Sequence, residues 1–371
     1  MKNSVILILI WSFILSSCSK DDDNGSNSGK VYVINNTTFG ISSNKSNARQ
    51  TTDGINHAIE KAKTEGYTHI KLNPGEYLIR CTGASGYEDW NGLFMPNNIT
   101  LDLTGVKLYV ESNTATSCKL IRIDQVENVT IKGGHLIGER NDYNSPSDKH
   151  SGSCAIDIAC SRNITIDGTK IEQFAGSAIW IGYGFIAPNE RRLNKNIKIL
   201  NCEISDSWMQ GISVVHASDM EIAYNKIYNI GGIEPGFGID IEPEADWTGS
   251  HPWKSWVENV NIHHNEFKDI IGFKGDKVGL CIVNHYSTDI EAADNTFENS
   301  AIVINRSPKR IRLIRNTLKG WDSYMVARTS EDVYMPLEGP NKNNPEYPAR
   351  VANCSTLTGY ITETDNYTQC D

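Results

Sequence analysis

The sequence predicts an all-β protein, a right-handed parallel β-helix whose coils stack into one solenoid. Three observations predict this fold. A short segment of Ile-x-Ile type recurs, a second β-type segment follows most of these, and Asn returns at one turn position. The first segments are LIRID at 120–124, AIDIA at 155–159, AIWIG at 178–182, GISVV at 211–215, GIDIE at 238–242, GLCIV at 279–283 and AIVIN at 301–305.

The recurring aliphatic pairs predict the core of the solenoid. From Asp157 onward, matching positions are separated by 23, 33, 27, 41 and 22 residues, so the shortest spacings define a bare coil and the longer ones add loops. Because successive side chains of a strand point to opposite faces, every second residue turns inward. The inward pairs are Ile121/Ile123, Ile156/Ile158, Ile179/Ile181, Ile212/Val214, Ile239/Ile241, Leu280/Ile282 and Ile302/Ile304.

A turn after the second segment predicts a stack of side-chain amides. The second segments are NVTI at 128–131, NITI at 163–166, NIKI at 196–199, DMEI at 219–222, NVNI at 259–262 and RIRL at 310–313. Asn225, Asn265, Asn295 and Asn316 follow at one equivalent position, where stacked amides can hydrogen-bond along the axis. A third short strand then completes each coil.

The remaining elements are predicted at the two ends of the solenoid. The segments between strands leave no room for crossover helices, which excludes a Rossmann-type α/β fold. Residues 52–65 are typical of an amphipathic helix that caps the N-terminal end of the core. We expect one domain over 31–371, with repeats at about 90–325 and a C-terminal cap at about 326–371.

Composition excludes several classes of protein. The chain has 371 residues, of which 39% are hydrophobic and 22% charged, which is enough apolar material for a core. The net charge of -10 argues against a general nucleic-acid binder, which needs a basic surface. The mean hydropathy of -0.40 argues against an integral membrane protein.

The N-terminus predicts export. Residues 1–17 have one Lys and a short apolar run, as in a signal peptide. The LSSC sequence ending at Cys18 resembles the lipobox of bacterial lipoproteins, and this resemblance implies that Cys18 carries the lipid. Residues 18–30 form a polar, flexible tether. Their Cys-Ser-Lys-Asp-Asp-Asp order resembles the surface-export signal of Bacteroidetes lipoproteins, which implies an outer-membrane anchor with the body facing outward; a periplasm-facing body is the alternative.

The other cysteines do not form a zinc site, because no pair has the required spacing with neighbouring His. Disulfides are permitted in the expected compartment. Cys354 with Cys370 and Cys154 with Cys160 are the candidate pairs. Cys202 and Cys281 fall at repeat positions and are expected to be buried free thiols.

Two regions resemble known β-helix proteins. THIKLNPGEYLI, NNITLDLTG and NVTIKGGHLIGERND resemble the opening of the pectate-lyase-like superfamily. The later segments QGISVV and GIDIEP resemble a large group of bacterial right-handed β-helix repeat proteins. The resemblance covers roughly residues 50–320 and implies the fold. It leaves the activity open, because the superfamily includes hydrolases, lyases, epimerases and adhesins.

The outward residues of the first strands form a candidate site. They predict columns along one face, with coils about 4.8 Å apart. Asp240 and Glu242 both point outward and are expected about 7 Å apart. Because neighbouring carboxylates repel, one of them titrates at higher pH, and together they can act as the acid and the base of glycoside hydrolysis. Glu244 and His216 are expected to assist, and Asp157, about 14 Å away by the coil spacing, is expected to bind another sugar unit.

Aromatic and polar residues around these acids predict a glycan cleft, because flat rings stack on the apolar face of a pyranose. The loop at 244–259 contributes three tryptophans directly after the acidic strand. The candidate substrate-binding residues are Trp180, Tyr183, Trp208, Ser213, Trp247, Trp253, Trp256, Arg140, His150 and His285.

The favoured interpretation is a glycoside hydrolase that acts on a polysaccharide, without a cofactor and as a monomer. The first alternative is a polysaccharide lyase in which Asp240, Glu242 and Glu244 hold Ca²⁺, a hard cation that prefers carboxylate oxygens. No Lys or Arg base falls in the carboxylate column, which favours the hydrolase. The second alternative is a glycan-binding protein without catalysis. Nucleotide, serine-hydrolase and zinc-protease motifs are absent in proper context.

Overall fold

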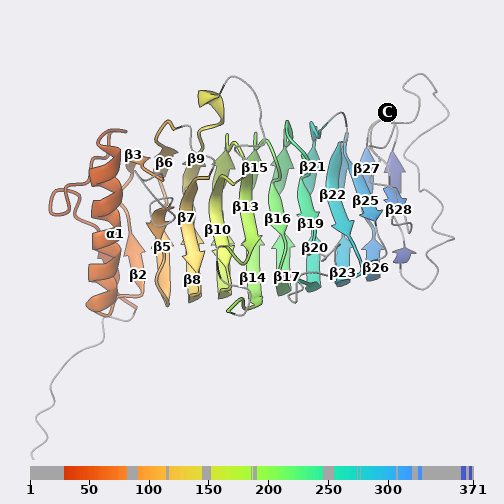
Figure 1. Ribbon diagram of the computed structural model, residues 1–371, viewed down its shortest axis with the longest axis horizontal. Coiled ribbons are helices and arrows are strands. Elements are labelled where there is room, and N and C mark those ends of the chain that lie inside the picture. The colour runs from red at the N-terminus through yellow and green to blue at the C-terminus, as the bar shows by residue number, and fades with distance from the viewer. Residues whose placement is uncertain are drawn as a thin grey trace, which may run out of the picture.

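The computed structural model shows parallel strands stacked into one elongated solenoid (Figure 1). It describes residues 29–81, 91–113, 117–143, 152–184, 186, 190–244, 255–273, 275, 277–305, 308–319, 325–327, 361–364 and 367–369. Residues 1–28, which include the predicted signal peptide, Cys18 and most of the predicted tether, lie outside this part of the chain.

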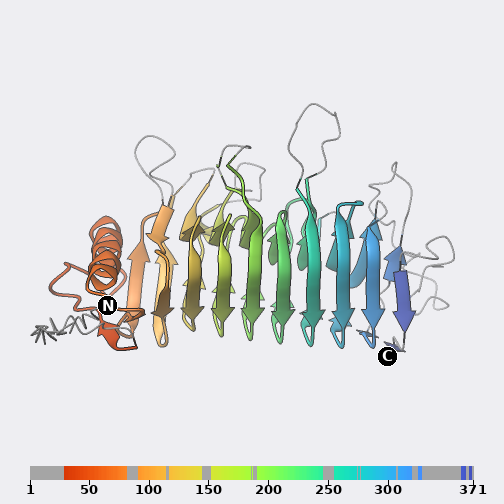
Figure 2. The same ribbon diagram turned by 90° about the horizontal axis from the view of Figure 1, so that it is seen from below.

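Three parallel sheets, A, B and C, run along the solenoid, and each complete coil contributes one strand to each of them (Figure 2). Sheet A contains β1 (Val31–Val33), β2 (His69–Lys71), β5 (Ile99–Asp102), β8 (Glu127–Lys132), β11 (Arg162–Asp167), β14 (Asn194–Leu200), β17 (Ala217–Ala223), β20 (Val257–His263), β23 (Ser287–Ala293), β26 (Lys309–Ile314) and β29 (Ile361–Thr364). Sheet B contains β3 (Gly75–Ile79), β6 (Val106–Val110), β9 (His135–Ile137), β12 (Lys170–Glu172), β15 (Glu203–Ser205), β18 (Lys226–Tyr228), β21 (Glu266–Lys268), β24 (Thr296–Glu298), β27 (Thr317–Lys319) and β30 (Tyr367–Gln369). Sheet C contains β4 (Asn91–Phe94), β7 (Lys119–Asp124), β10 (Cys154–Ala159), β13 (Ser177–Gly182), β16 (Ile212–Val214), β19 (Ile239–Ile241), β22 (Val278–Val283), β25 (Ala301–Asn305) and β28 (Met325–Ala327).

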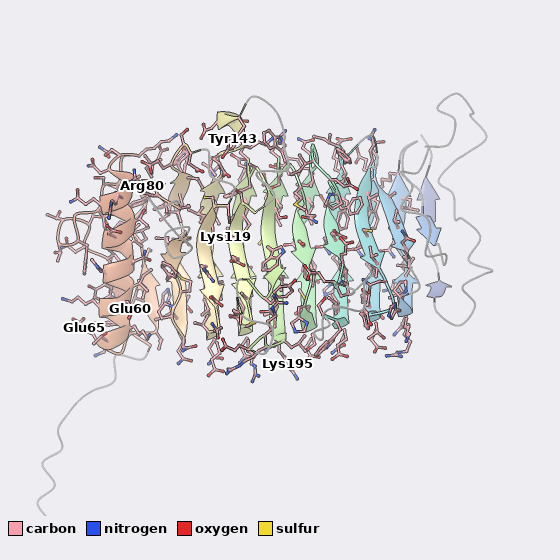
Figure 3. All side chains as sticks on the ribbon, viewed as in Figure 1. Glu60, Glu65, Arg80, Lys119, Tyr143 and Lys195 are labelled. Atoms are coloured by element: carbon pink, nitrogen blue, oxygen red, sulfur yellow. The ribbon has the colours of Figure 1, made fainter. Side chains whose placement is uncertain are left out.

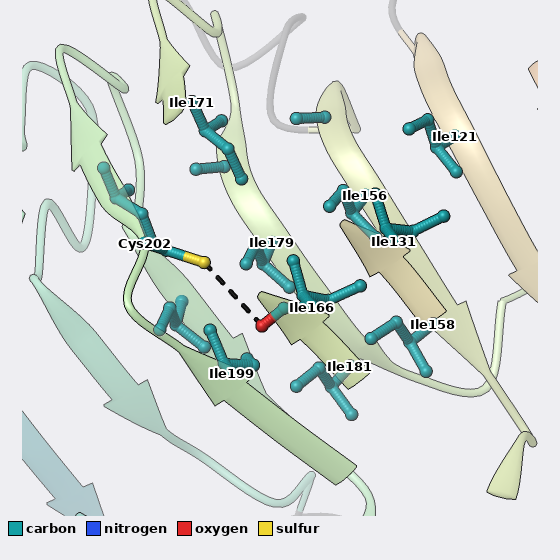
Figure 4. Close-up of a cluster of buried hydrophobic side chains, with 14 of the residues drawn as sticks. Ile121, Ile131, Ile156, Ile158, Ile166, Ile171, Ile179, Ile181, Ile199 and Cys202 are labelled. Carbon is teal, nitrogen blue, oxygen red and sulfur yellow. Dashed lines mark hydrogen bonds between the residues drawn. The ribbon is translucent and has the colours of Figure 1, made fainter. Parts of the chain in front are cut away.

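The predicted Ile-x-Ile segments form sheet C in the expected register. Ile156 pairs with Ile121 on one side and Ile179 on the other, and Ser213 pairs with Asp240. The predicted inward side chains are all buried, and they stack coil on coil in the core (Figure 4). The all-β, parallel β-helix prediction is therefore confirmed.

The asparagine stack is also confirmed. The Nδ2 of Asn225 donates to the Oδ1 of Asn265 at 2.9 Å, and the same bond repeats from Asn265 to Asn295 and from Asn295 to Asn316. Each Nδ2 also donates to a backbone carbonyl of sheet A. The amides therefore hydrogen-bond the turn of each coil to the neighbouring coils.

The N-terminal helix α1 (Ala48–Thr64) covers one end of the solenoid (Figure 1). The apolar face predicted from the sequence is buried, with Ile55 and Ile59 against the core. Asn56 fixes the helix to β4, since its Nδ2 donates to the carbonyl of Gly92 and its Oδ1 accepts from the N–H of Phe94. No helix of the described residues is long and apolar enough to cross a membrane.

The structure differs from the sequence analysis at the C-terminal end of the solenoid and at two cysteines. The strands β29 and β30 continue sheets A and B, so part of the segment assigned to the C-terminal cap belongs to the last coil. Cys154 and Cys160 are buried free thiols, which corrects the proposed disulfide between them. Cys202 and Cys281 are buried free thiols as expected, and Cys354 and Cys370 lie outside the described residues.

Candidate functional site

The outer face of sheet C carries the predicted column of side chains. Strand pairing aligns Arg122, Asp157, Trp180, Ser213, Asp240, Cys281 and Val303 in that order along the axis. Charged and aromatic residues therefore occupy the coils from β7 to β19, whereas the coils from β22 on present Cys and Val. The side chains of this column that can take part in chemistry therefore lie on the coils from β7 to β19.

Asp240 is the most strongly perturbed carboxyl of this face. The side chain is 1% exposed, although it alternates with the inward-facing Ile239 and Ile241. The Nε2 of Gln210 donates to its Oδ2 at 3.0 Å, and Ser177 Oγ donates to the Oε1 of Gln210 at 2.6 Å. Asp240 is thus held by a chain of side chains that crosses three coils.

Glu242, two residues after Asp240, raises the pKa of the buried Asp240 carboxyl. Burial raises the pKa of Asp240 well above its usual range, and the charge of Glu242 raises this pKa further. Asp240 is buried and Glu242 is half-buried, so the acid that keeps its proton to higher pH is the buried one of the two.

Trp180 lies flat against the sheet because the next outward residue of its strand has no side chain. A Cβ on Gly182 would lie 2.4 Å from the Cη2 atom of the indole. The ring is half-buried, with Lys119 Nζ 5.5 Å from its centroid and the ring of Tyr183 at 6.0 Å. A broad aromatic surface is thereby presented two coils from Asp240.

Tyr183 and Glu244 connect two loops that follow sheet C. The hydroxyl of Tyr183 donates to the Oε2 of Glu244, and the guanidinium of Arg191 lies 3.7 Å from the centroid of the tyrosine ring. Burial raises the pKa of Tyr183, so its hydroxyl stays protonated and remains a donor. Glu244 itself is exposed, which leaves its carboxyl within reach of solvent.

His216 packs beside this face as a neutral side chain. Burial lowers its pKa to about 4, so the imidazole is uncharged at neutral pH. Its Nδ1 accepts a hydrogen bond from the backbone N–H of Trp256 at 3.3 Å, and the two rings meet edge to face at 4.7 Å. The structure therefore places His216 as a support for Trp256, which is 38% exposed, rather than as a charged partner of Glu244.

A second charged group lies toward the N-terminal end of the face. Asp157 is buried, its Oδ1 meets no hydrogen-bond partner, and the ammonium group of Lys119 lies near it. Arg122 bonds to Asp124 at 2.7 Å on the preceding coil. Strand pairing places Asp157 three coils from Asp240, which corresponds to about 14 Å by the coil spacing.

Several predicted residues do not join the site. Trp208 is buried beside Tyr143, with ring centroids 6.0 Å apart, and Arg140 lies 5.6 Å from the Trp208 ring, in the turns between sheets B and C. Both were expected on the face, and the structure corrects this because these turns direct them to a separate cluster. His285 is exposed and packs on Tyr286. His150, Trp247 and Trp253 lie outside the described residues.

The sequence did not single out Gln210, Ser177 or Lys119. Their only signal was their position, since each stands at or just before the start of a sheet C strand. In the described part of the chain, no three His, Cys, Asp or Glu side chains are arranged to hold a metal ion.

Another perturbed carboxyl lies outside this face. Glu139, in the turn after β9, is 2% exposed, and burial raises its pKa from the ordinary 4.5 to about 7. It precedes the short helix η2 (Arg140–Asp142), at the edge where Figure 3 labels Tyr143 and away from Lys119 on sheet C.

Replacing Glu139 by Gln is expected to stabilise the protein at alkaline pH. The folded state keeps this proton up to about pH 7, whereas the unfolded chain releases it near pH 4.5, so the carboxyl makes stability fall as the pH rises through this window. The variant should gain about 3 kcal/mol of unfolding free energy at pH 8 and almost nothing at pH 4. Urea denaturation at both pH values measures this, with the exposed Glu127→Gln as the control. An equal effect at both pH values would contradict the argument.

Comparison with known proteins supports the fold. The model of the family described as "Right handed beta helix region" matches residues 121–318. Among curated proteins, the chain is similar to YclG of Bacillus subtilis, with 27% identity over 69% of this chain and 46% of that protein. It is also similar to the SPbeta prophage-derived YorA of the same organism, with 22% identity over 80% of this chain and 56% of that protein. The chain thus spans about half the length of these relatives.

Solved structures agree in architecture at low sequence identity. The family 28 exopolygalacturonase of Yersinia enterocolitica is similar with a TM-score of 0.57 and 12% identity, covering 92% of this chain and 77% of that one. The surface adhesin PfbA of Streptococcus pneumoniae gives 0.56 and 12%, covering 92% and 97%. The A-module of the mannuronan C-5 epimerase AlgE4 of Azotobacter vinelandii gives 0.54 and 12%, covering 79% and 81%. Coil register, core and family match together show that this chain belongs to the right-handed β-helix family.

Proposed function

We propose that this protein is a glycoside hydrolase that cleaves a polysaccharide on the outer face of sheet C. The observation that carries the proposal is the Asp240–Glu242 pair, in which Asp240 is 1% exposed, accepts a hydrogen bond from Gln210 and precedes the half-buried Glu242 by two residues, with its pKa raised by burial and by Glu242. Such a pair holds a transferable proton at a pH at which isolated carboxyls are ionised. The exopolygalacturonase and the epimerase that share the fold act on carbohydrates by their names, which supports the substrate class.

The pair supplies the acid, and Glu244 supplies the base. The proton of the Asp240–Glu242 pair passes to the glycosidic oxygen as the bond from that oxygen to the anomeric carbon breaks. A water molecule adds to the anomeric carbon and loses its proton to the Glu244 carboxylate. Glu244 stands two residues after Glu242, beyond the end of β19, and the proposal requires its carboxylate to lie at the separation of about 6.5–9.5 Å that inverting hydrolysis needs.

Trp180 provides the platform for a sugar ring. Its indole lies flat over Gly182 on the same face as the carboxyl pair, which is the geometry for stacking on a pyranose. We expect Trp180→Ala to weaken binding of the oligosaccharide about 10-fold, since stacking contributes roughly 0.5–1.5 kcal/mol beyond the buried area. Isothermal titration calorimetry with a substrate fragment measures the effect. The control is Tyr224→Ala, an exposed aromatic after sheet A, and a loss of affinity in this control but not in Trp180→Ala would refute the platform.

A panel of polysaccharides tests the proposal. New reducing ends without an ultraviolet-absorbing unsaturated product support hydrolysis. An unsaturated uronate that disappears on adding a chelator would support the calcium-dependent lyase instead. Binding without any new ends, unchanged in an Asp240→Asn/Glu242→Gln variant, would leave a glycan-binding protein, a role consistent with the adhesin that shares the fold.

The N-terminal sequence supports a proposed location. LSSC and the acidic tether suggest an outer-membrane lipoprotein whose body reaches polysaccharide at the cell surface. Labelling with a fatty acid in cells should be lost in Cys18→Ser, and protease digestion of intact cells distinguishes a surface-exposed body from a periplasm-facing one.

A further inference from the structure

We propose that Gln210 is a positioning residue that, oriented by Ser177, fixes which oxygen of Asp240 carries the transferable proton. The proposal rests on the hydrolase function above, because it concerns the same carboxyl. The three side chains belong to successive coils, at the start of β13, just before β16 and within β19. All three are buried, so water does not compete for the bonds between them.

The orientation of the Gln210 amide follows from its two partners together, Ser177 and Asp240. Ser177 Oγ lies 2.6 Å from Oε1, and a carbonyl oxygen can only accept, so the serine hydroxyl must be the donor. The NH₂ group of Gln210 then faces Asp240, with Nε2 3.0 Å from Oδ2. A flipped amide would donate to the serine oxygen instead and would place its own oxygen against Oδ2 of Asp240, where it would repel the carboxylate left after proton transfer.

This arrangement makes the two oxygens of Asp240 unequal. Oδ2 accepts the N–H of Gln210 and is therefore the oxygen that carries the negative charge after proton transfer. Oδ1 is buried and meets no donor in the described part of the chain, so the proton resides there. The neutral carboxyl donates from Oδ1, and the bond from Gln210 stabilises the carboxylate left behind.

Gln210 also moderates the acidity of Asp240. Burial and Glu242 both raise the pKa of Asp240, while the hydrogen bond from Gln210 lowers it. Without this bond the proton would be held too firmly to reach the glycosidic oxygen. The amide therefore keeps the buried acid transferable, which explains why a polar pair, Ser177 and Gln210, occupies positions that Phe237 and Val278 fill in later coils.

The test is Gln210→Leu, which keeps the size of the side chain and removes the donor. We expect the alkaline limb of the kcat profile to move up by about one pH unit and kcat to fall about 10-fold or more, with KM little changed. Ser177→Ala, a smaller change, should move the limb in the same direction because the amide is no longer held. The control is Gln173→Leu, a partly exposed glutamine in the turn after β12 that contacts Asn141.

A second readout separates this proposal from the function itself. Carbon NMR of the Asp240 carboxyl, titrated without substrate, should show its midpoint shifted to higher pH in Gln210→Leu and Ser177→Ala. An unchanged midpoint in both folded variants would overturn the positioning role, even if the protein is a hydrolase. A shifted titration midpoint of Asp240 in a protein that cleaves no polysaccharide would refute the proposed function but would still support the positioning role of Gln210.

Discussion

Replacing Asp240 by Asn is expected to lower kcat by about 100- to 10,000-fold, which is the usual contribution of a positioned general acid. Asn has nearly the same shape and its amide oxygen can still accept the bond from Gln210, so the geometry of the face is retained. The transferable carboxyl proton of Asp240 is lost. Reducing-end release under saturating substrate measures the effect.

The same variant should be more stable than the parent protein at neutral pH. Because the folded-state pKa of Asp240 is raised above the ordinary 3.8, its contribution to stability declines as the pH rises above that value. Asn removes this dependence, so thermal melting at pH 7 should shift upward while activity falls. The exposed Asp53→Asn on α1 should change neither property. Full activity in Asp240→Asn would show that Asp240 is not the acid of the reaction.

Replacing Asn265 by Ala is expected to cost about 3 kcal/mol of unfolding free energy. The side chain makes four hydrogen bonds: its Nδ2 donates to Ile222 and Asn295, and its Oδ1 accepts from the backbone and the side chain of Asn225. A neutral bond in a buried turn contributes roughly 0.5–1.5 kcal/mol, so the loss of all four is consistent with a cost of about 3 kcal/mol.

Urea denaturation measures this loss. Asn261→Ala is the matched control, since Asn261 is exposed on β20 of the same coil and should change stability by less than about 0.5 kcal/mol. Because each coil contacts mainly its neighbours, the loss can appear as a separate transition of the coils around β20 and β23. A variant as stable as the control would show that the amide stack contributes no net stabilisation.

The fold could be predicted because its determinants repeat locally. Ile239 and Ile241 have the same neighbours as Ile212 and Val214, so one coil specifies the next, and the period-2 alternation assigns inward and outward faces before any coordinate is known. The Asn225–Asn316 stack was predictable for the same reason. In each case the residue that makes the contact and the residue that receives it are copies of one repeat position.

The chemistry of the site depended on contacts that do not repeat. The sequence by itself determined the solenoid, the order of the sheet C column and the neighbourhood of Asp240 and Glu242. Only the tertiary structure showed that Asp240 is buried and bonded to Gln210, that His216 is neutral against Trp256, and that Trp208 belongs to another cluster. The physical reason is that burial and charge depend on side chains brought together from different coils and from loops of unequal length, whereas the register of a β-helix depends on one strand and its nearest neighbours.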